Sequence, residues 1–164
     1  MAAKAQRIMS LVQSILHSYA NPAPVFKRMW AGGVEERTNL ALVMGACAAG
    51  FVSAWPSLSR QSFITGEPLD QLMGGALLGW VMIAPLMLYV LAFMLFLLSR
   101  IWSSAASSAQ VRRILFWALV VGTPVLLLHG LVAGFIGAGT AKTIVGAIWM
   151  GVILRTIIVG FRSA

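Results

Sequence analysis

Four long apolar runs, almost free of charged residues, dominate this chain. The runs cover about residues 39–58, 72–98, 114–136 and 143–161. Each exceeds the roughly 18 residues that a helix needs to cross the hydrocarbon of a bilayer. Lipid cannot hydrogen-bond to backbone groups, so a span must be a helix or part of a closed barrel, whose strands would alternate apolar and polar side chains. These runs do not alternate, and the sequence therefore predicts an all-α polytopic membrane protein with about four transmembrane helices.

An amphipathic segment, Lys4 to Tyr19, precedes the first run. Its apolar side chains fall at helical spacing on one face, namely Ile8, Leu11, Val12, Ile15, Leu16 and Tyr19. This pattern is typical of a helix that lies in the headgroup plane, and we expect Pro22 and Pro24 to break it. The sequence thus predicts a cytoplasmic interfacial region over 1–38 and a transmembrane domain over 39–164.

The charge distribution predicts an orientation. The formal net charge is +8. Nine basic residues would lie on one side of the membrane: Lys4, Arg7, Lys27, Arg28, Arg37, Arg100, Arg112, Arg113 and Arg162. Only Arg60 and Lys142 would lie on the other side, so the positive-inside rule places both termini in the cytoplasm. We expect basic side chains to meet lipid headgroups rather than nucleic acid, above all Lys4, Arg7, Lys27, Arg28, Arg112, Arg113 and Arg155.

Few polar or helix-breaking residues lie inside the runs. Arg155 is the charged exception, and its head can snorkel to the interface near Arg162 or can pair or bind lipid within the membrane. His129 can hydrogen-bond to a neighbouring helix or relay protons, but no span contains an acid to take the proton onward. We expect plain helix kinks at Pro85 and Pro124, because no polar cluster of the kind found at transporter sites accompanies them.

Small residues recur four positions apart in the runs, a spacing that lets helix backbones approach closely. The pairs are Ala46 and Gly50, Gly75 and Gly79, Gly130 and Gly134, and Ala147 and Gly151. We expect these pairs to pack within the bundle, with contact to a partner protein as the alternative.

The sequence contains no recognisable signature of metal binding, catalysis or phosphate binding. The single cysteine, Cys47, and two distant histidines do not form a metal-binding pattern. The sequence also contains no nucleophile paired with a base and no phosphate-binding loop. We expect no cofactor and no enzymatic activity, and interpret the serines at 103, 104, 107 and 108 as a polar loop.

The order of segments is similar to that of a known family. The amphipathic start reads SLVQSILHSYANPAPVFKRMW, and LFWALVVGTPVLLLHGLVAGFIGAG is followed late in the chain by VGAIWMGVILRTIIVGF. Together these resemble the Yip family of Rab/Ypt-GTPase-interacting membrane proteins, in its short alphaproteobacterial branch. The resemblance implies a multi-span protein of a bacterial inner membrane with a cytoplasmic amino end and without catalytic residues. The family usually has five spans, and its eukaryotic members act with small GTPases that a bacterial member would lack.

Two classes of function fit these observations. A non-catalytic inner-membrane scaffold or accessory subunit would act through helix–helix and lipid contacts, alone or within a larger membrane protein complex. A small transporter or channel would need a polar lumen, for which the runs offer Ser53, Thr123, His129 and Thr156. Convergence of these four side chains on one pocket would favour transport, and the oligomeric state stays open.

Overall fold

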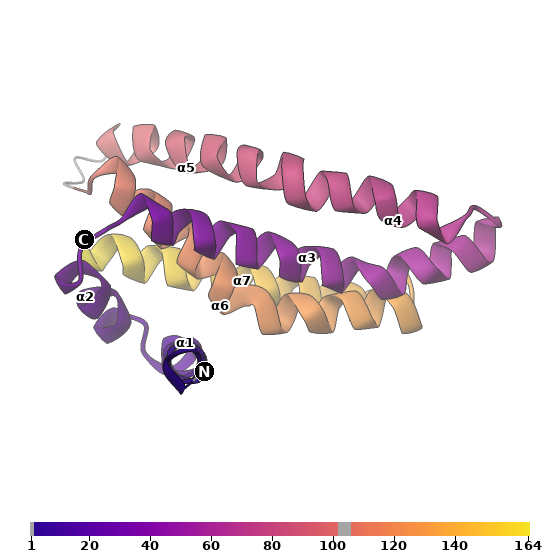
Figure 1. Ribbon diagram of the computed structural model, residues 1–164, viewed down its shortest axis with the longest axis horizontal. Coiled ribbons are helices and arrows are strands. Elements are labelled where there is room, and N and C mark those ends of the chain that lie inside the picture. Colours follow the sequence, from indigo (N-terminus) through magenta and orange to yellow (C-terminus); the bar gives the residue numbers. More distant parts are fainter. Residues whose placement is uncertain (1, 102–105) are drawn as a thin grey trace.

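The chain folds into helices throughout the part that the structure describes (Figure 1). The computed structural model describes the backbone of residues 2–101 and 106–164, with side chains from residue 11 onward in those ranges. In chain order the elements are α1 (Ala2–Ala20), α2 (Ala23–Ala31), α3 (Glu36–Thr65), α4 (Leu69–Leu78), the π-helix η1 (Gly79–Ile83), α5 (Ala84–Ile101), α6 (Ser108–Phe135) and α7 (Thr140–Ser163). None of the described residues forms a strand, which confirms the all-α class.

Four continuous helices are long and apolar enough to cross a membrane, as predicted. They are α3, the α4–η1–α5 helix, α6 and α7. Figure 1 shows them running along the long axis of the molecule with successive helices antiparallel. The start of α3, the end of α5, the start of α6 and the end of α7 therefore gather at one end of the bundle, which we call the terminal end because the carboxyl terminus lies there.

Helix α6 forms the centre of the bundle. It contacts α3, α5, α7 and α1. Half of its most apolar window is buried inside the protein, against 11% for the α4–η1–α5 helix. The segment from Ile114 to Val121 is apolar on all sides, and Phe116 and Trp117 are almost fully buried within it. A helix that is apolar all round belongs in the interior, so α6 is the element around which the others assemble.

Two of the expected connections are shorter than the sequence predicted. The stretch between the first two predicted runs, Ser59 to Gln71, was expected to be a loop but is mostly helical. Helix α3 continues through Pro56 and leaves only residues 66–68 between α3 and α4. A proline removes one backbone hydrogen bond, which a long helix with tertiary contacts can tolerate. The helix ends at Gly66, whose φ of 76° is left-handed and suits glycine.

The second shorter connection lies between α5 and α6. There Ser107 is the N-cap of α6 and forms a capping box with Gln110, and Ser108 is already helical. The loop interpretation of Ser103 and Ser104 concerns positions outside the described residues.

The two intramembrane prolines have different surroundings. Pro124 lies within α6, which continues through it. Pro85 follows η1, where five residues adopt π-helical pairing, so the helix changes its register here in addition to losing one donor. The sequence predicted only a plain kink at Pro85. The π turn was missed because hydropathy carries no signal for it.

The amino-terminal segment forms two short helices beside the terminal end of the bundle. Figure 1 shows α1 nearly end-on, so its axis runs across the long axes of the spans. The break after α1 falls at Asn21 and Pro22. Pro24 does not break the chain as expected. It lies in the first turn of α2, where its missing N–H would have no helical partner anyway.

Candidate functional site

Helix α1 is fixed to α6 by two side-chain hydrogen bonds. Trp117 donates from Nε1 to Oγ of Ser18 at 3.1 Å, and both residues are 1% exposed. The Tyr19 hydroxyl donates to the carbonyl of Val121 at 2.7 Å. Burial raises the pKa of the Tyr19 phenol, which keeps this donor protonated. The end of α1 is therefore held in one orientation on the central helix.

Arg155 of α7 binds the last turn of α1. Its Nη1 donates to the carbonyl of Tyr19 at 2.6 Å and its Nη2 to the carbonyl of Ala20 at 3.0 Å. The last carbonyls of a helix lack intrahelical partners and carry the negative end of the helix dipole. The guanidinium therefore closes the carboxyl end of α1, and its partner is backbone rather than an acidic side chain.

Helix α2 covers the end of α7. Trp30 donates from Nε1 to the carbonyl of Ser163 at 2.9 Å, and its ring stacks on Phe26 with centroids 5.7 Å apart. Phe26 is fully buried, and its ring lies so close to Gly160 that a Cβ there would come within 3.0 Å. Because Gly160 has no side chain, the Phe26 ring of α2 can pack directly against the backbone of α7.

The apolar face predicted for α1 divides between the bundle and the surface. Ile15 and Tyr19 pack against the core, whereas Leu11, Val12 and Leu16 are 41%, 49% and 63% exposed. Among the expected headgroup contacts in this region, Lys27 and Arg28 of α2 are exposed. The side chains of Lys4 and Arg7 lie outside the described residues.

A polar cluster at the terminal end joins three spans. One oxygen of Glu36, Oε2, accepts hydrogen bonds from Nε and Nη2 of Arg112 at 3.1 and 2.8 Å. The other, Oε1, accepts from the hydroxyl of Tyr89 at 2.8 Å. Glu36 therefore ties α6 and α5 to the start of α3.

Arg113 belongs to the same cluster but points into the protein. Its side chain is 5% exposed, and it donates to Oδ1 of Asn39 at 2.5 Å and to the carbonyl of Glu35 at 3.2 Å. These hydrogen bonds hold the guanidinium inside the protein, whereas we expected it to contact lipid headgroups. Sequence reasoning missed this cluster, although the acidic pair at the start of the first run and the basic pair at the start of the third were a usable signal.

The small-residue pairs fall into two groups. Gly130 lies against the carbonyl of Ser53, and Gly134 lies against Pro56, so this pair brings α6 into close contact with α3. Other members of the predicted set are not close-packed, since among the described residues no atom lies within 4 Å of a Cβ built on Gly75, Gly79 or Gly151, and Ala147 is exposed.

In the described part of the chain, the four residues expected of a polar lumen, Ser53, Thr123, His129 and Thr156, do not hydrogen-bond to one another. Three hydroxyls donate to a carbonyl of their own helix: Ser53 to Gly50 at 2.8 Å, Thr123 to Leu119 at 3.2 Å and Thr156 to Val152 at 2.8 Å. The ring of His129 lies 3.6 Å from the position of a Cβ on Gly146 of α7. Each group is thus accommodated separately.

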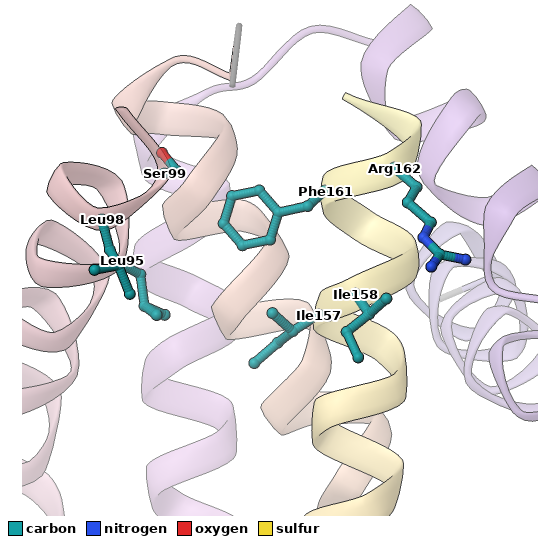
Figure 2. Close-up of a pocket in the computed structure, with 7 residues that line it drawn as sticks. All are labelled: Leu95, Leu98, Ser99, Ile157, Ile158, Phe161 and Arg162. Carbon is teal, nitrogen blue, oxygen red and sulfur yellow. The ribbon is translucent and has the colours of Figure 1, made fainter. Parts of the chain in front are cut away.

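Two of the cavities in the described part of the chain lie beside the spans. The larger, of about 710 Å³, is lined by Leu95, Leu98 and Ser99 of α5 and by Ile157, Ile158, Phe161 and Arg162 of α7. Figure 2 shows apolar side chains of both helices facing it, while the guanidinium of Arg162 points to the side away from α5. The smaller, of about 260 Å³, is lined by Ala46, Cys47, Trp80, Ala84, Met87, Leu88, Leu119, Leu126 and Trp149. Neither cavity is lined by the four residues expected of a polar lumen. The described residues contain no group of three or more His, Cys, Asp and Glu side chains that could hold a metal ion.

Comparisons with known proteins found no match for this chain. No family model, curated protein or solved structure matches the chain. The resemblance to the Yip family stays a prediction from the order of segments.

Proposed function

We propose that the protein is a non-catalytic membrane scaffold or accessory subunit that acts through helix–helix and lipid contacts. The observation that carries this proposal is that the hydroxyls of Ser53, Thr123 and Thr156 each bond to their own helix. A path for a polar solute would need such groups to face a shared lumen. Their separate placement favours a protein that works by contact.

A small transporter or channel is the second candidate. One observation favours it: a cavity of about 260 Å³ lies among the spans beside η1. Within the described residues, the indole Nε1 of Trp149, which also lines this cavity, is buried without a hydrogen-bond partner. π-helical turns often occur at functional sites. If the protein is a transporter, its solute would pass through this region.

The location that we propose is a bacterial inner membrane with both termini in the cytoplasm, as in the short Yip-like proteins that the chain resembles. The nine-to-two distribution of basic residues supports this orientation. The antiparallel order of the spans supports it too, because four helix ends that carry basic residues lie together at the terminal end of the bundle: the start of α3, the end of α5, the start of α6 and the end of α7.

The partner-facing surface that we propose comprises two glycine-containing faces, Gly75 with Gly79 and Ala147 with Gly151. These faces are not close-packed against the described chain. A helix of another membrane protein could approach either face closely, in which case recognition would depend on shape rather than charge.

Purification of the native protein in mild detergent tests the proposal. We expect a membrane protein to co-purify, and we expect Gly75→Leu with Ala147→Leu to abolish that association while the variant stays folded. Gly130→Leu is the contrasting variant, because it should disturb the bundle itself. If the protein purified without a partner and reconstituted vesicles showed solute flux, the proposal of an accessory function would be wrong and transport would take its place.

A further inference from the structure

The position of α1 along the spans determines how deep it lies in a bilayer. The apolar run of α6 begins at Ile114, and Val121, which holds Tyr19, lies seven residues further on. At 1.5 Å per residue this is about 10 Å along the helix. On α7, Arg155 precedes the end of the apolar run at Phe161 by six residues, or about 9 Å. The Trp117 bond to Ser18, three residues or about 5 Å past Ile114, and the Val121 bond to the Tyr19 hydroxyl thus both place the last turn of α1 below the boundary of the hydrocarbon.

This depth falls within one leaflet. The hydrocarbon of a bilayer is about 30 Å thick, so one leaflet contributes roughly 15 Å. The uncovered edge of α1, comprising Leu11, Val12 and Leu16, therefore lies at the level of acyl chains. Acyl chains are the occupant that fits this edge, because the helix is held at that level by bonds to two spans.

The face of α1 beside this edge does not suit hydrocarbon. Gln13 and His17 are exposed on it. Polar groups are costly in lipid without partners. Headgroups and water must therefore descend to reach these two side chains, while acyl chains meet the edge formed by Leu16 and its neighbours.

We propose that α1 is a wedge in one leaflet: it binds acyl chains with its Leu11–Val12–Leu16 edge, draws headgroups down to its polar face, and gives the protein a preference for strongly curved membranes. The inference rests on the proposed function only for the lipid contacts. Insertion of an in-plane helix into one leaflet enlarges the headgroup area of that leaflet alone, and such binding depends on curvature. The exposed Lys27 and Arg28 of α2 add attraction to anionic headgroups.

Depth measurements test the placement. Cysteines would replace Leu16 or Gln13 in a Cys47→Ser background of the full chain, each would carry a nitroxide, and the protein would be reconstituted into phosphatidylcholine–phosphatidylglycerol vesicles. We expect the label at 16 to be accessible to oxygen, which concentrates in hydrocarbon, and the label at 13 to be accessible to an aqueous nickel chelate. Aqueous exposure of both labels would overturn the wedge, and so would shielding of the label at 16 from both reagents, because protein would then cover the edge.

Sorting between flat and curved regions of one membrane tests the consequence. In large vesicles from which a narrow tube of the same lipids is drawn, the protein can diffuse between the two regions, and we expect wild-type protein to concentrate on the curved tube. Val12→Ser with Leu16→Ser should lose this enrichment, and thermal unfolding would verify that the variant is folded. Met82→Ser with Leu86→Ser, which changes two equally exposed positions on a span, should retain it.

Equal loss in both double variants, or no enrichment of the wild type, would overturn the proposal. Co-purification of a partner is scored separately, so failure of the wedge and failure of the accessory function give different results.

Discussion

Two arginines near the membrane spans bind the ends of helices rather than acids. Arg155 reaches the carbonyls of Tyr19 and Ala20, and Arg60 donates to the carbonyls of Gly134 and Phe135 at 3.3 Å. A guanidinium carries five donors in a rigid fork, which suits the cluster of unpaired carbonyls at a helix end. The sequence singled out Arg155 as a charge inside a span, but it could not reveal a backbone partner more than a hundred residues away.

Loss of the Arg155 contact should release α1. We expect Arg155→Gln to weaken the docking of α1 by about 1.5–3 kcal/mol, the range for hydrogen bonds that involve a charged group. Limited proteolysis near Asn21 would measure the release as faster cleavage. Arg162→Gln, two turns along the same helix and with an exposed side chain, is the control and should cleave like the wild type. Unchanged cleavage of both variants would show that α1 is held without the guanidinium.

The glycines of α6 and α4 should respond differently to the same substitution. Gly130→Leu would place a side chain against the Ser53 carbonyl, where no space exists, and we expect the variant not to form a stable bundle. Gly75→Leu meets open surroundings and should fold normally. Thermal unfolding in detergent compares the two, and a destabilised Gly75→Leu together with an intact Gly130→Leu would contradict the packing described here.

At the scale of elements, the α4–η1–α5 helix is the span least enclosed by the others. Its contacts with α3 include the ring of Trp80, which packs on Gly50, and the hydroxyl of Tyr89, which donates to Glu36. The existence of this helix followed from its apolar length, as did the existence of the other three. The π turn of η1 and the passage of α3 through Pro56 did not, because hydropathy reports affinity for lipid and carries no information on how backbone hydrogen bonds rearrange.

The Glu36 contact should determine how firmly α5 is held. We expect Glu36→Gln to lower the melting temperature, since a neutral amide loses the ion pair with Arg112 and weakens the bond from Tyr89. A loss of about 1 kcal/mol corresponds to roughly 2–4 °C for a chain of this size. Glu35→Gln is the matched control, because the structure uses the backbone carbonyl of Glu35 in its bond to Arg113. An equal shift in both variants would point to net charge rather than to the contact with α5.

At the scale of the whole molecule, the protein is an antiparallel bundle with two short helices on one flank of its terminal end. Composition and charge were enough to predict the spans and propose a direction. They were not enough to predict that the polar cluster of Glu36 and the docking bonds of Ser18 and Tyr19 lie at that same end, because these bonds join residues from separate helices whose rotation about their axes is set by packing.

Topology reporters test the direction that we propose. A fusion after Ala164 should report cytoplasm, and an insertion within residues 66–68 should report the opposite compartment, because the two sites lie at opposite ends of the bundle. Protein levels measured by an epitope tag serve as the control for unstable fusions. A carboxyl end outside the cytoplasm would contradict the charge rule for this chain and reverse the leaflet that contains α1.

The bonds that hold the first two helices also impose an order on biosynthesis. Helices α1 and α2 leave the ribosome before the four long helices, but the donors and acceptors that fix them belong to Trp117, Val121, Arg155 and Ser163. Helices α3 to α7 must be made before α1 and α2 can reach their final positions, and Ser163 at the end of α7 completes the site of α2. A nascent chain that stops short of Arg155 therefore exposes a free amphipathic helix, so the state of the amino terminus records whether the carboxyl-terminal span has been made.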